Sequence, residues 1–159
     1  MTKLLLAVHG LAAVITIGPV TVAASMFPPA VRRALAAPDD PSGLATVRTL
    51  HRICRVYAVI AVAVPVFGLA TASSLHVLGS AWLITSIVLT ALAAAVLGAR
   101  ILPRQVLALA ALDGPAETLK PAVVQRVAAQ LGVLTGVFNL LWAAVTILMI
   151  IRPGSTTGA

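Results

Sequence analysis

The stretch LLLAVHGLAAVITIGPVTVAASM, residues 4–26, contains 23 residues and no charged side chain. An α-helix rises about 1.5 Å per residue, so about 20 apolar residues cross a hydrocarbon layer of roughly 30 Å. The stretch is therefore long enough to span a membrane as a helix. It also contains one histidine, His9, less than two helical turns after the start of the stretch.

Three further stretches of the chain have the same character. Residues 56–72, 77–99 and 127–151 carry no charge. With the helical residues expected to adjoin them, the four spans cover about residues 4–26, 51–72, 77–99 and 122–151. Hydrophobic residues make up 60% of the chain, charged residues 9%, and the mean hydropathy is +1.09. These values predict an all-α, four-helix transmembrane bundle that forms a single domain over residues 1–159.

The first stretch has one alternative interpretation, a secretory signal peptide. Lys3 precedes the apolar run, and Val22-Ala23-Ala24 resembles a cleavage site of small residues. The apolar core of a signal peptide, however, has about 7 to 15 residues. The longer run favours an uncleaved span.

The distribution of positive charge predicts the orientation of the bundle, because Lys and Arg in short loops stay on the cytoplasmic side. The two long connections hold nine of the 11 basic residues: Arg32, Arg33, Arg48, Arg52, Arg55, Arg100, Arg104, Lys120 and Arg126. Only Lys3 and Arg152 lie on the other side. We therefore expect both connections in the cytoplasm and both termini outside.

The same basic residues indicate a partner. They flank apolar spans without interleaved aromatic residues, so the net charge of +7 does not indicate nucleic-acid binding. Membrane lipids are the expected partner, with Arg52 and Arg55 at anionic headgroups.

Prolines and polar residues predict where helices end. Residues 27–29, Phe-Pro-Pro, are expected to stop the first helix, and Asp40 or Ser42 to cap the second. Pro65 should bend the second span, and residues 103–112 are expected to form a short amphipathic helix.

Small and polar residues suggest how the helices pack. Gly132, Gly136 and Asn139 recur along the fourth span, and Ser86 and Thr90 along the third. Such residues allow close contact and hydrogen bonds between helices in lipid. We expect the Asn139 amide to bond Ser86 or Thr90. Packing within the chain is preferred, and dimerisation through the glycines is the alternative.

Few side chains could carry chemistry. His9 and His76 are expected near the same membrane surface, where two imidazoles could ligate haem iron or copper. The alternative is that His9 bonds a neighbouring helix and His76 is a loop residue. His51 and Cys54 are spaced to share a metal or a redox role, but the arginines around them favour a lipid-facing basic patch.

Residues 9–13 (HGLAA), 18–20 (GPV) and 25–28 (SMFP) resemble a bacterial family of small predicted integral membrane proteins without an assigned activity. The likeness extends over nearly the whole chain. It implies that the protein is located in a bacterial plasma membrane. A more distant similarity links this opening to membrane proteins of the copper-resistance CopD type and to haem-associated membrane oxidoreductases. That similarity implies a metal or haem site at His9.

The sequence contains no catalytic motif that would indicate an enzyme. The preferred hypothesis is a structural or accessory component of a membrane assembly, acting as a homo-oligomer or with another membrane protein. The alternative is a haem- or copper-binding membrane protein that uses His9 with a second ligand such as His76. A small transporter is ranked last, because the spans contain no carboxylate relay.

The orientation can be tested by cysteine labelling in intact cells. In a Cys54→Ser background, an Asp39→Cys protein should resist a membrane-impermeant maleimide, whereas a Ser74→Cys protein should react. Reaction of the cysteine at position 39 from outside would contradict the expected orientation.

Overall fold

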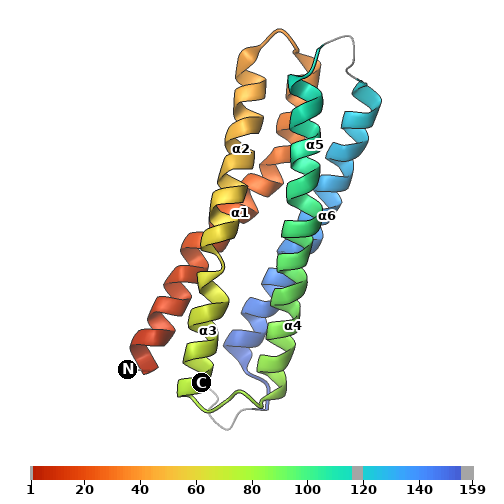
Figure 1. Cartoon of the computed structure of the whole chain (residues 1–159). Coiled ribbons are helices and arrows are strands. Elements are labelled where there is room, and N and C mark those ends of the chain that lie inside the picture. Colours follow the sequence, from red (N-terminus) through yellow and green to blue (C-terminus); the bar gives the residue numbers. More distant parts are fainter. Residues whose placement is uncertain (1, 116–119, 155–159) are drawn as a thin grey trace.

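The computed structural model describes residues 2–115 and 120–154, and these residues form four long helical rods (Figure 1). The first is α1 (Thr2–Ala36) and the last is α6 (Pro121–Ile151). The second rod joins α2 (Pro41–Ile60) to α3 (Ala63–Ser74), and the third joins α4 (Ala81–Val96), a π-helical turn η1 (Leu97–Ile101) and α5 (Leu102–Asp113). The predicted all-α four-helix bundle is confirmed, and each rod is long and apolar enough to span a membrane.

The rods are longer than a membrane is thick. α1 has 35 residues and is about 50 Å long, whereas the hydrocarbon layer measures roughly 30 Å. We call the half of the bundle next to the α1–α2 connection the connection half, and the half where α1 begins and α6 ends the terminus half. The basic residues other than Lys3 and Arg152 lie toward the connection half. Because charged side chains are costly in hydrocarbon, we expect this half to extend beyond the layer.

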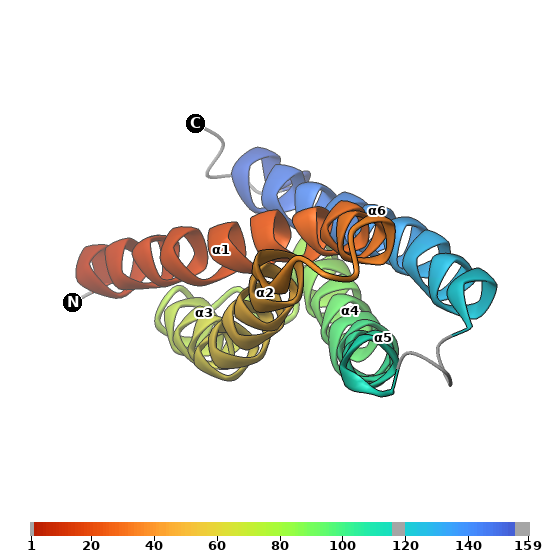
Figure 2. The ribbon, with the colours of Figure 1, turned by 90° about the horizontal axis from the view of Figure 1, so that it is seen from above.

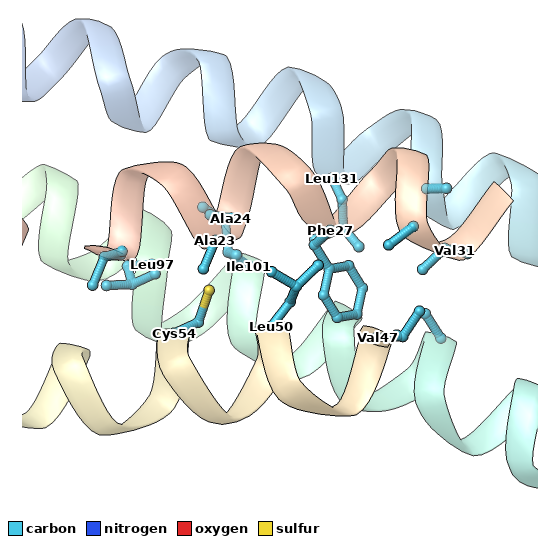
Figure 3. Close-up of a cluster of buried hydrophobic side chains, with 14 of the residues drawn as sticks. Ala23, Ala24, Phe27, Val31, Val47, Leu50, Cys54, Leu97, Ile101 and Leu131 are labelled. Atoms are coloured by element: carbon cyan, nitrogen blue, oxygen red, sulfur yellow. The ribbon is translucent and has the colours of Figure 1, made fainter. Parts of the chain in front are cut away.

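The rods pack unevenly along their length. α1 packs against α2, α3 and α6, α4 packs against α6, and α2 packs against α5 (Figure 2). The main buried cluster is centred on Phe27, Ile101 and Leu131, which are almost fully buried in the connection half (Figure 3). In the part of the chain that the structure describes, the terminus half has a smaller cluster of Ala72, Trp82 and Leu83.

The prediction that residues 27–29 stop the first helix is wrong, because α1 continues to Ala36. Pro28 cannot donate a hydrogen bond to the Ala24 carbonyl, four residues earlier. The Thr135 hydroxyl on α6 donates to that carbonyl instead, over 3.5 Å. A neighbouring helix thus satisfies the group that proline left free, as membrane helices allow.

The other predicted helix signals have mixed outcomes. The second rod breaks at Ala61 and Val62, before Pro65, as expected. Asp40 caps α2 and accepts bonds from the Ser42 hydroxyl and backbone N–H, which lower the pKa of its carboxyl below the ordinary value. The helix expected over residues 103–112 is present as α5, but it continues the third rod through η1.

The bond between Thr135 and the Ala24 carbonyl can be tested by Thr135→Val. The substitution leaves a buried carbonyl without its donor, so the free energy of unfolding should fall by about 1 kcal/mol. Thermal unfolding in detergent, followed by circular dichroism, measures the change.

Thr85→Val is the matched control. Thr85 is exposed, and its hydroxyl bonds only the Ala81 carbonyl of its own helix. Equal melting temperatures for the two variants would show that the bond to Ala24 does not support α1.

Candidate functional site

A large cavity lies in the terminus half, among all four rods. Its volume is about 770 Å³, within the range of about 300 to 1,000 Å³ that is usual for small-molecule sites. Its wall is mostly apolar, and many of its residues are small: Gly10, Ala13, Gly18, Gly68, Ala91 and Ala94. A smaller cavity of about 260 Å³ shares Pro65, Thr90 and Trp142 with it and extends it toward the main cluster.

His9 lines the large cavity and is fixed at its rim. Its Nδ1 atom lies 3.0 Å from the backbone carbonyl oxygen of Val64 on α3. A carbonyl oxygen can only accept a hydrogen bond, so Nδ1 carries a proton, and in the neutral imidazole Nε2 then holds the lone pair. Within residues 2–115 and 120–154, Nε2 has no hydrogen-bond partner. The Nε2 lone pair is therefore free to bind a metal or to accept a proton.

Gly68 makes room for the imidazole ring. A Cβ atom at Gly68 would lie 3.0 Å from Cε1 of His9 and 3.3 Å from Nδ1. Because that approach is tighter than nine in ten real Cβ contacts, alanine would require the ring to shift by a few tenths of an ångström. Gly68 and Val64 together hold the ring in one orientation.

The hydroxyl groups of the cavity wall are already used as donors. Ser86, Thr90 and Thr146 each donate to a carbonyl of their own helix, four residues earlier. The indole N–H of Trp142 is buried and has no acceptor among the described residues. Of these polar groups, the wall thus offers His9 Nε2 to a ligand.

His76 does not line this cavity. It is exposed in the turn between α3 and α4, with a positive φ of 55°. The structure thus places the two histidines that the sequence analysis paired in different surroundings.

The two glycines that were expected to pack the fourth span against the rest of the chain do not face another helix. Gly132 and Gly136 are exposed, and a Cβ atom added to either would meet nothing within 4 Å. Their expected role in packing within the chain is therefore wrong. The buried face of α6 instead consists of Val124, Ala128, Leu131, Thr135, Phe138 and Val145.

Helix geometry explains this difference. Residues spaced by four drift about 40° around the helix at each step. A stripe that starts at the buried Ala128 has therefore left the packed face by Gly136.

The expected partner of Asn139 is also wrong. Its Nδ2 donates to Ser25 Oγ on α1 over 3.2 Å, and its Oδ1 is buried without a partner among the described residues. Ser86 and Thr90 bond within α4 instead. Asn139 does not line the cavity.

The segment around Cys54 divides into two faces. Arg52 and Arg55 are exposed, as headgroup contact requires. Cys54 is fully buried, so its predicted place in a lipid-facing patch is wrong. Gln105 on α5 accepts from His51 Nδ1 over 3.0 Å and donates to Cys54 Sγ over 3.5 Å, which turns both side chains toward α5.

Comparisons of the chain with protein-family models, with curated proteins and with solved structures gave no match.

Proposed function

We propose that this chain is a multi-pass membrane protein that binds haem b in the cavity beside His9, with Nε2 of His9 as an axial ligand. The observation that carries the proposal is the hydrogen bond between His9 Nδ1 and the Val64 carbonyl. Histidines that ligate metals usually donate their other ring N–H to a carbonyl or carboxylate, which fixes the tautomer and the ring orientation.

The cavity wall supports this assignment. It is apolar and large, and none of its lining residues carries a charge, which suits the hydrophobic faces of a porphyrin. When bound, haem supplies one-electron transfer at its iron. The role of the chain is to supply the ligand, to orient it through Val64 and Gly68, and to exclude water with its apolar wall.

Binding of copper, the alternative to haem iron at His9, is less well supported. Copper and other transition metals are held by several nitrogen or sulfur ligands. Among the described residues, no three His, Cys, Asp or Glu side chains lie close enough to hold an ion. The size of the cavity also exceeds what a single ion requires, so we prefer haem.

The proposal predicts that detergent-purified protein, titrated with haem, develops a Soret band. His9→Ala should lose this band, because no other imidazole lines the cavity. His76→Ala is the matched control and should bind as the unchanged protein does. An unchanged band in His9→Ala, or no saturable binding by the unchanged protein, would refute the proposal.

The same titration tests the orientation of the ring. Gly68→Ala should weaken binding by roughly tenfold, in the range known for residues that orient a metal ligand. Gly10→Ala is the control, because Gly10 also lines the cavity but a Cβ atom there meets nothing within 4 Å.

A second function, compatible with the first, is that of an accessory component in a membrane assembly. The supporting observation is the exposed position of Gly132 and Gly136 on α6. Two glycines spaced by four allow another helix to approach closely in lipid. We propose that this face contacts a second copy of the chain or another membrane protein. In the orientation expected from charge, Arg52 and Arg55 would contact headgroups of the cytoplasmic leaflet.

Self-association through this face can be tested by the double variant Gly132→Leu, Gly136→Leu. Added side chains should hold the helices apart, so chemical crosslinking in membranes should lose its dimer band. The exposed neighbours Val133 and Val137, changed to leucine, provide the control. If the unchanged protein yields no dimer, the partner is not a second copy.

A further inference from the structure

The cavity contains a second side chain that can bind iron. Met149 of α6 lines the same cavity as His9 of α1. We propose that Met149 is the second axial ligand of the haem, so that the site has one imidazole and one thioether ligand. This inference rests on the proposed function.

The chemistry of the lining residues leads to Met149. Haem iron in proteins is held by His, Met, Cys or Tyr side chains. The hydroxyls of Ser86, Thr90 and Thr146 are not in this set, and the indole nitrogen of Trp142 has no lone pair to give. The remaining lining residues apart from His9 and Met149 are aliphatic. Imidazole and thioether are an established pair of haem ligands.

The position of Met149 supports the same assignment. Met149 packs beside the cluster of Ala72, Trp82 and Leu83, which belongs to α3 and α4, whereas His9 contacts Val64 and Gly68. The two side chains thus come from different helices. Methionine is unbranched and has three rotatable bonds, so its sulfur can adjust to a ligand.

Arg152 fixes the backbone next to Met149. Its Nε donates to the Met149 carbonyl over 3.2 Å, and its guanidinium carbon lies 5.8 Å from the centre of the Trp82 ring. These contacts hold the last turn of α6 against α4.

The test compares haem-loaded Met149→Leu with haem-loaded Met26→Leu. Leucine has nearly the volume of methionine, and Met26 is exposed on α1 outside the cavity. Met149→Leu should still bind haem through His9 but lose the sulfur-to-iron charge-transfer band, with a shift toward a high-spin spectrum. Its reduction potential should fall, because a methionine ligand raises the potential. Met26→Leu should match the unchanged protein.

A second variant separates loss of the ligand from loss of the fold, because it replaces the thioether by another iron ligand. Met149→His should give a low-spin spectrum with two imidazoles and a lower potential than the unchanged protein. If Met149→Leu keeps the unchanged spectrum and potential while His9→Ala loses haem, Met149 is not a ligand and the proposed function stands. If His76→Ala instead shows the spectral loss, the second ligand is His76. If the unchanged protein binds no haem, both proposals fail.

Discussion

The arrangement of the four rods depends on where apolar side chains can leave water. Moving such side chains out of water lowers the free energy, whereas moving them from hydrocarbon to another apolar surface changes it little. The cluster around Phe27, Ile101 and Leu131 lies in the connection half, the half that we expect to extend beyond a hydrocarbon layer. Among the described residues, the terminus half has a smaller cluster and an open cavity of about 770 Å³. One end of the bundle is packed, and the other is built around a cavity.

Backbone carbonyls impose the second requirement, because in lipid a free polar group has no water to bond. Thr135 donates to the Ala24 carbonyl, which Pro28 leaves without its helical donor, and this bond joins α6 to α1. His9 donates to the Val64 carbonyl and joins α1 to α3. That bond has a chemical consequence as well, since it directs the lone pair of Nε2 away from the backbone. The contact that ties the two helices therefore also orients the nitrogen that we propose as a metal ligand.

Part of the candidate site could be predicted from the sequence. His9 is conspicuous as a histidine in an uncharged span. The structure shows its expected helix contact, through Nδ1, whereas a ligand role for Nε2 is our proposal. Gly68, Trp142 and Met149 carry no comparable signal, because glycine, tryptophan and methionine are ordinary in apolar helices. Their importance depends on which of them face one cavity.

The sequence by itself determined the class of protein, the four rods, the break before Pro65 and the Asp40 cap, because length, hydropathy and local hydrogen bonding act within single segments. Only the tertiary structure decided that α1 continues past Pro28, that Gly132 and Gly136 face outward, and that Cys54 faces inward. Each of these depends on the rotation of one helix against another. In a span that is apolar on every side, hydrophobic periodicity is too weak to fix that rotation, so packing contacts and interhelical hydrogen bonds decide it.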